Sequence, residues 1–182
     1  MHSHMDEGWL WSFEEYYQGT IGRDGNIDQS GGCVKCTLNN VYQSLLKNPE
    51  RKYQMAETAF FKRWWFDQPA NVKANVRKMI QEKQFEFVNG GWSANDEACT
   101  YYEDIIDNFI TGHRWINNEF GIDVNIGWQI DSFGHSSTHA ALMAQAGYDG
   151  IFFGRLDYRD WEQRRVNQAL EMNWKPQSPH NE

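Results

Sequence analysis

Short apolar runs alternate along this sequence with segments of helical periodicity, and this alternation limits the fold more than any other feature. The apolar runs, rich in β-branched and aromatic residues, occur at about 52–57, 85–88, 124–130 and 150–153. Apolar residues recur with helical spacing around 38–46, 72–80 and 101–110. Strands separated by helices are typical of βαβ units with parallel strands. The sequence therefore predicts an α/β fold with a parallel sheet.

The chain of 182 residues contains no internal repeat and no Gly/Ser-rich linker, so we read 1–182 as a single domain or part of one. Residues 175–182 are rich in polar residues and proline, and we expect them to be disordered. The net charge of -8 and the pI near 5.2 argue against nucleic acid as a partner. No apolar run approaches the roughly 20 residues that cross a bilayer, so we expect no membrane partner.

Three cysteines, Cys33, Cys36 and Cys99, are too few for a disulfide framework. The pair Cys33 and Cys36 is also compatible with half of a zinc site or with a redox pair. We interpret it as two ordinary thiols at the start of a helix.

Polar residues stand where the predicted strands end, at Glu57, Asn89, Asp131 and Arg155. Parallel α/β folds build their sites at the C-terminal ends of strands, so these residues should meet at one edge of the sheet. Asp131 is the most informative of these residues about function, because it closes an apolar strand. A carboxylate there loses hydration, so a metal, a charged partner or a catalytic role is needed to offset the cost of desolvation.

The start of the chain belongs to the same edge. His2, His4 and Asp6 alternate, so an extended segment would project all three side chains from one face. Imidazole and carboxylate groups at this spacing suit a divalent metal, although such triplets also occur on ordinary polar loops. We also expect a strand earlier in the natural protein, ahead of residue 1.

Six segments together resemble glycoside hydrolase family 38, and in particular its lysosomal-type α-mannosidases. They have the family's order and spacing, and the likeness runs from residue 2 to about Trp174. The segments are HMDEGW at 4–9, AFFKRWW at 59–65, NGGW at 89–92, NDEA at 95–98, QIDSFGHS at 129–136 and FFGRLDY at 152–158. Ser132, Met5 and Glu7 depart from the commoner family residues and leave the liganding side chains intact.

The resemblance implies a zinc ion held by His4, Asp6 and Asp131, with Asp131 also the nucleophile of a retaining α-mannosidase. It further implies that Trp9 lines the mannose subsite and that Arg155 stands near the nucleophile. Apart from the resemblance, a strictly structural alternative stays open, in which Arg155 pairs with Asp157 on the surface and Trp9 belongs to the core.

The resemblance also implies the fold, the substrate and the location of the protein. The fold is a parallel β/α barrel-like catalytic domain, seven-stranded and irregular, present here only in part. Zn²⁺ is the cofactor, and the substrate is a mannose-containing oligosaccharide or glycoprotein. The remainder of the same catalytic chain would supply the general acid and a further zinc ligand, so we expect these 182 residues alone to bind zinc poorly and to be inactive. The relatives in this family are lysosomal or secreted, which implies the same location for this protein. The sequence leaves open whether the protein forms a homo-oligomer.

Two other readings of the sequence remain. One is a metal-dependent deacetylase-like hydrolase, in which the metal activates water. The other is a carbohydrate-binding or structural remnant without catalysis. Of the neighbouring polar residues, we expect Glu57 and Asp96 to support the ligands or to be structural, and His135 to act as a hydrogen-bonding support. We expect structural roles for His113 and His139.

Overall fold

The computed structural model describes residues 1–21, 25–28 and 32–175, so the predicted disorder of the tail falls almost entirely outside the described residues. The helices are α1 (Phe13–Gln18), α2 (Val34–Lys47), α3 (Thr58–Asp67), α4 (Ala70–Gln81), α5 (Tyr102–Phe120), α6 (Ser137–Gln145) and α7 (Tyr158–Val166). The strands are β1 (Thr20–Ile21), β2 (Ile27–Asp28), β3 (Tyr53–Met55), β4 (Phe85–Phe87), β5 (Ile126–Gln129) and β6 (Gly150–Phe153).

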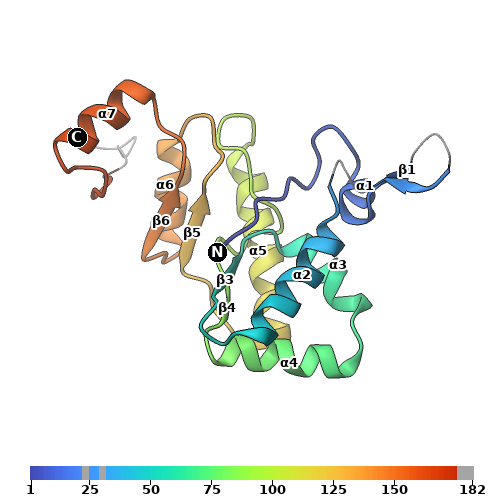
Figure 1. Cartoon of the computed structure of the whole chain (residues 1–182). Helices are drawn as coiled ribbons and strands as arrows, with labels where there is room; N and C mark the ends of the chain where they lie inside the picture. The colour runs from blue at the N-terminus through green and yellow to red at the C-terminus, as the bar shows by residue number, and fades with distance from the viewer. Residues whose placement is uncertain (22–24, 29–31, 176–182) are drawn as a thin grey trace.

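The four strands that the sequence predicts are all present, and they pair in parallel. β3 pairs with β4, with Tyr53 opposite Phe85, and β5 pairs with β6, with Gly127 opposite Ile151. Helices separate the strands of each pair, as the alternation of patterns predicts. Figure 1 shows β5 and β6 standing beside β3 and β4, with α2 and α4 on one side of the molecule. The α/β class is confirmed.

Asn89, directly after β4, joins the two pairs of strands. Its main-chain N–H donates to the carbonyl of Ile126 at 2.7 Å, and its side-chain oxygen accepts from the N–H of Trp128 at 3.2 Å. Because the Asn89 side chain is buried, these bonds hold the end of β4 against β5 without competition from water.

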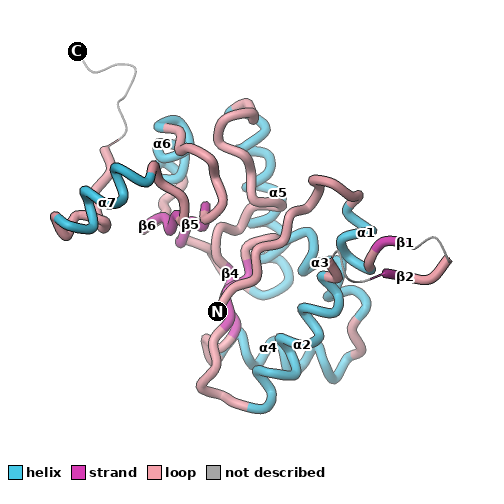
Figure 2. Tube along the Cα trace, turned by 45° about the horizontal axis from the view of Figure 1, so that its top comes forward, coloured by secondary structure: helices cyan, strands magenta, loops and turns pink. Residues whose placement is uncertain are grey.

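The first residues of the chain lie along the free side of β3, as an extended segment. The N–H of Gln54 donates to the carbonyl of Met1 at 2.8 Å, and the His2 ring contacts the carbonyl of Gln54 at 2.9 Å through Nδ1. The predicted extended start is therefore confirmed, and it places residues 1–6 next to the sheet (Figure 2).

The seven-stranded barrel, which was predicted to be present here only in part, is not confirmed by the described residues. Closure of a barrel requires its first and last strands to bond to each other. Among the described residues the sheets are three two-stranded pairs, and one of them, β1 with β2, is an antiparallel hairpin that the sequence analysis did not predict. The described part of the chain therefore has two open parallel pairs and one antiparallel pair.

Aromatic rings fill the core between α3, the strands and α5. α3 follows β3 directly and turns four fully buried rings inward, spaced as on one helical face. This helix was not predicted from the sequence, although the spacing of its aromatic residues indicates a helix. The principal rings of this cluster are Phe60, Phe61, Trp64 and Trp65 of α3, Phe85 and Phe87 of β4, and Phe120 of α5.

The helices predicted around 38–46, 72–80 and 101–110 are confirmed as α2, α4 and α5. The interpretation of Cys33 and Cys36 as separate thiols is wrong, because a disulfide joins them. Cys33 is the N-cap of α2 and Cys36 lies in its first turn, so the helix brings their Cα atoms to 5.2 Å, within the usual range for a disulfide. Cys99 is free and exposed.

α7 lies at the edge of the molecule, apart from the aromatic core, and buries none of its residues (Figures 1 and 2).

No helix in the described ranges is both long and apolar enough to span a membrane.

Gly112 allows α5 to pack directly on the loop after β4. A Cβ atom added at Gly112 would lie 2.1 Å from the carbonyl oxygen of Gly90 and 2.7 Å from the N atom of Trp92, both of which are backbone. We expect Gly112→Ala to lower the free energy of unfolding by about 3 kcal/mol or more, because overpacking against backbone cannot relax by a change of rotamer. Chemical denaturation measures this loss. Gly150→Ala is the control, since its Cβ would meet nothing within 4 Å, and equal effects of the two substitutions would contradict the prediction.

Candidate metal centre and active site

The extended segment at the start of the chain sets three side chains at increasing distance from the core. His2 is nearly buried, with 8% of its side chain exposed, whereas the exposed fraction is 30% for His4 and 44% for Asp6. Met5, on the opposite face of the segment, packs into the core. The alternation seen in the sequence therefore directs His4 and Asp6 toward the edge where the parallel strands end.

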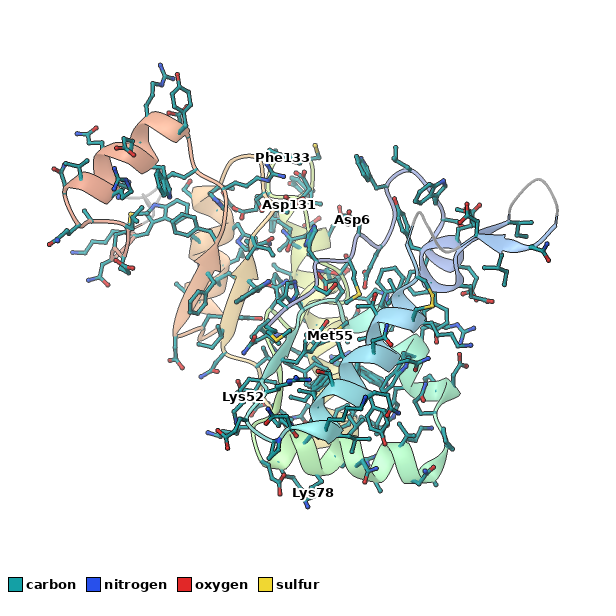
Figure 3. All side chains as sticks on the ribbon, viewed as in Figure 1. Asp6, Lys52, Met55, Lys78, Asp131 and Phe133 are labelled. Carbon is teal, nitrogen blue, oxygen red and sulfur yellow. A yellow bond between two sulfur atoms is a disulfide. The ribbon has the colours of Figure 1, made fainter. Side chains whose placement is uncertain are left out.

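Asp131 approaches the same point from the end of β5. The Nε2 atom of His4 lies 3.2 Å from Oδ1 of Asp6 and 3.3 Å from Oδ2 of Asp131. The three ligand atoms all lie within 4.8 Å of one another. Figure 3 shows Asp6 and Asp131 close together, on the initial segment and on the loop after β5. The structure thus brings together the three residues that the sequence analysis proposed as metal ligands.

Arg155, directly after β6, pairs with the other oxygen of Asp131. Its Nε and Nη2 atoms both lie 2.6 Å from Oδ1 of Asp131. Its guanidinium also stands 4.7 Å from the centre of the Phe133 ring. The alternative in which Arg155 pairs with Asp157 is wrong, because Asp157 instead contacts Arg159. The two oxygens of Asp131 therefore face different partners, a guanidinium and an imidazole.

Glu57 lies beneath the cluster, at the start of α3, and is 1% exposed. Its Oε1 atom is 3.7 Å from Nδ1 of His4 and 3.8 Å from Nε2 of His2. Neither carboxylate oxygen has a hydrogen bond of standard geometry within the described part of the chain. Burial raises the pKa of Glu57 to about 8, and the charge of Asp6 adds to this, while nearby main-chain N–H groups oppose it.

This placement gives Glu57 the supporting position that the sequence analysis expected, on the side of the His4 ring opposite Asp6 and Asp131. At 3.7 Å the contact is longer than a hydrogen bond. A carboxyl oxygen on that side still favours a hydrogen on Nδ1 of His4, which leaves Nε2 free to bind a metal.

A cavity of about 710 Å³ opens beside the cluster, between the initial segment, α3 and the loop after β4. Its lining includes His4, Asp6, Lys62 and Trp92. Glu7 also lines it, and burial, followed by the charge of the nearby Glu57, raises the pKa of Glu7 to about 9. Neither Lys62 nor Glu7 stands at the end of a predicted strand, so no role was predicted for either residue.

Trp9 is neither in the core nor in the lining of that cavity. Its side chain is 74% exposed, on the loop that follows Asp6, so the interpretation as a core residue is wrong. Asp96 accepts hydrogen bonds from the N–H groups of Ala98 and Cys99, at 2.6 and 2.8 Å, and so stabilises a turn rather than a helix start.

The other histidines have structural contacts, as expected. His113 contacts the hydroxyl of Tyr148 at 2.6 Å, and buried His139 contacts the side-chain amide of Gln129 at 3.1 Å. Desolvation lowers the pKa of both imidazoles. His135 lies outside the cluster of His4, Asp6 and Asp131 and is held by hydrogen bonds on both sides of its ring.

The fold and these contacts define an α/β protein with a candidate divalent-metal site at the C-terminal ends of its parallel strands. Residues 1–180 match the model of the glycosyl hydrolases family 38 N-terminal domain, and the chain belongs to this family.

Several curated proteins are similar over 96% of the chain. Identity is 45% to a probable alpha-mannosidase of Arabidopsis thaliana, 42% to the lysosomal alpha-mannosidase of Dictyostelium discoideum and 42% to the alpha-mannosidase of Canavalia ensiformis. The chain spans only 16–17% of the length of these relatives.

Among solved structures, an alpha-mannosidase from Enterococcus faecalis is similar to 84% of the chain, with a TM-score of 0.63 and 19% identity. The chain covers 16% of that structure. At this identity the likeness concerns the fold, and it agrees with the α/β arrangement described above.

Proposed function

We propose that this chain carries the metal-binding and nucleophilic part of the active site of a zinc-dependent retaining α-mannosidase. The observation that carries the proposal is the convergence of Asp6 and Asp131 on one nitrogen of His4, at 3.2 and 3.3 Å. Asp131 is far from His4 and Asp6 in the sequence, and all three stand where parallel α/β folds place their sites. The α-mannosidase relatives support the choice of substrate.

The three side chains suit zinc in chemistry and in spacing. One imidazole and two carboxylates form a ligand set typical of zinc, whose bonds of about 2.0–2.2 Å in a tetrahedron separate the ligand atoms by about 3.3 Å. Separations of 3.2 and 3.3 Å at His4 agree with that value. When bound, the ion would orient sugar hydroxyls and offset the negative charge of Asp6 and Asp131.

Asp131 is the residue that we assign as nucleophile. In a retaining reaction one of its oxygens forms a bond to the anomeric carbon while the bond from that carbon to the leaving oxygen breaks, and the leaving oxygen takes a proton from a second acid. Water then hydrolyses the glycosyl ester and restores the carboxylate. Arg155, with both nitrogens at 2.6 Å from Oδ1, holds the carboxylate in one orientation during these steps.

The partners of the chain follow from this assignment. The substrate is an oligosaccharide or glycoprotein with terminal α-mannose, and the general acid and a further zinc ligand come from the remainder of the catalytic chain. The lysosomal relatives favour a lysosomal location.

The test uses the complete protein that carries this chain, expressed from its full coding sequence with zinc. We expect hydrolysis of an aryl α-mannoside with retention of configuration, and a fluorinated mannosyl inhibitor that forms a stable ester with Asp131, identified by peptide mass spectrometry. A metal-activated water forms no ester, so turnover without any adduct would favour the deacetylase-like chemistry. A folded, zinc-loaded protein without turnover would favour a carbohydrate-binding or structural remnant.

Trp9 offers a prediction about substrate affinity. Its indole is exposed on the loop that follows Asp6, and an aromatic face of this kind packs against the apolar face of a sugar ring. We expect Trp9→Ala to raise KM about tenfold, which corresponds to the loss of roughly 1.4 kcal/mol of binding, with zinc content unchanged. Steady-state kinetics measure the effect. Trp161→Ala, which removes a part-exposed indole on α7, is the control, and an unchanged KM in Trp9→Ala would contradict the role.

A further inference from the structure

His135 is bound on both sides of its ring by groups that accept hydrogen bonds. Nδ1 lies 2.9 Å from Oε1 of Glu97, and Nε2 lies 3.0 Å from the main-chain carbonyl of Arg155. The ring of Phe153 packs edge-on against it, with centroids 5.2 Å apart. The imidazole therefore connects the loop after β4, which carries Glu97, with the end of β6.

Glu97 is a strong anchor because it is almost fully buried. Its side chain is 2% exposed, and its second oxygen accepts the N–H of Ser136 at 2.7 Å. His139 of α6 is the other titratable group facing this carboxylate, with Nδ1 at 3.9 Å from Oε2. Glu97 belongs to the NDEA segment that carries part of the family resemblance, but no role was predicted for it from the sequence.

The hydrogen bonds determine where the protons stand. A main-chain carbonyl only accepts, so Nε2 of His135 must donate to Arg155. The contact between Nδ1 and Glu97 then needs one further hydrogen, shared by the imidazole and the carboxylate. A hydrogen bond that involves ionised partners is shorter and stronger than a neutral one, so this pair is a rigid link.

The link ends at the residue that pairs with Asp131. His135 holds the main chain of Arg155, and the guanidinium of Arg155 then reaches Oδ1 of Asp131 at 2.6 Å. The side chain of Arg155 is 54% exposed, so its ion pair competes with water and with other rotamers. A fixed main chain removes part of that conformational freedom and favours the paired state.

We propose that His135 is a positioning residue, which acts with Glu97 to fix Arg155 against the carboxylate of Asp131. The inference rests on the proposed function, because it takes Asp131 as the reacting group. Its role in the reaction is indirect, since His135 contacts neither Asp6 nor Asp131 in the described contacts.

A double-mutant cycle in the complete zinc-loaded protein tests this role. We expect Arg155→Ala to lower kcat on an aryl α-mannoside about 100-fold and His135→Ala to lower it about tenfold or more, with little change in KM. The double variant should be within about threefold of Arg155→Ala alone, because His135 acts through Arg155. Effects that multiply, or a normal kcat in His135→Ala, would overturn the proposal.

His113→Ala is the matched control, because it also removes a partly buried, hydrogen-bonded imidazole. The imidazole of His113 contacts Tyr148 and not Arg155. We expect it to lower Tm and to leave kcat within about threefold of the wild type. A crystal structure of His135→Ala gives a readout independent of activity. Arg155 displaced from Asp131 supports the proposal, and Arg155 still paired with Asp131 overturns it. If the wild-type protein has no mannosidase activity, the proposed function fails, while this structure still decides the role of His135.

Discussion

Asp131→Asn should lower kcat on an aryl α-mannoside by about four orders of magnitude, more than any other single substitution proposed for this protein. The amide is a poor nucleophile for the anomeric carbon, and it loses the charge that attracts Arg155 at 2.6 Å and that a metal beside His4 would need. The complete protein loaded with zinc is the enzyme to assay, with zinc content measured on the same samples.

A second variant separates the two roles of this carboxylate. In Asp131→Gly, added azide should restore part of the turnover, because a small anion can occupy the space left by the side chain and attack the anomeric carbon. Asp157→Asn is the control, since Asp157 is an exposed carboxylate on the loop after β6 that contacts Arg159. It should behave as the wild type. Near-normal kcat in Asp131→Asn would contradict the nucleophile assignment.

His4→Ala should weaken zinc binding by more than about 100-fold, the upper end of the effect usual for residues that only support a ligand. The Nε2 atom of His4 faces both Asp6 and Asp131, so its loss removes the nitrogen ligand and leaves two carboxylates to repel each other. Competition with a chromophoric chelator measures the dissociation constant.

Glu57→Gln provides the comparison within the same cluster. The amide keeps the size of the buried side chain and replaces the carboxyl group whose oxygen faces Nδ1 of His4 at 3.7 Å. We expect a smaller effect on zinc affinity, about 10- to 100-fold. His113→Ala, which lies away from the cluster, should bind zinc normally. The metal assignment would be wrong if His4→Ala bound zinc as tightly as the wild type.

The disulfide and α3 show where local patterns were informative and where they were not. The spacing of Cys33 and Cys36 was visible, but the choice between free thiols, a metal and a disulfide depends on the positions of two Cβ atoms in the first turn of α2. The helical spacing of the rings of α3 was also visible in the sequence, because Lys62 and Arg63 separate the two pairs of rings. The backbone geometry of the structure decides both the disulfide and the helix.

The sequence by itself determined the parallel strands, the three longest amphipathic helices and the position of Asp131 at the end of an apolar run. These features depend on the periodicity of apolar residues over short stretches of the chain, and this periodicity can be read directly from the sequence. The resemblance to a known family supplied the set His4, Asp6 and Asp131, and the structure places these side chains together.

Only the tertiary structure decided that one oxygen of Asp131 faces Arg155 while the other faces His4. It also decided that Glu57 lies buried behind His4. The hydrogen bond between Glu97 and His135 is a third contact of this kind. Such contacts join residues that are distant along the chain, and the order and packing of the strands set their distances. Burial then determines how strongly each pair interacts, since the same carboxylate is weakly held in water and strongly held where water is excluded.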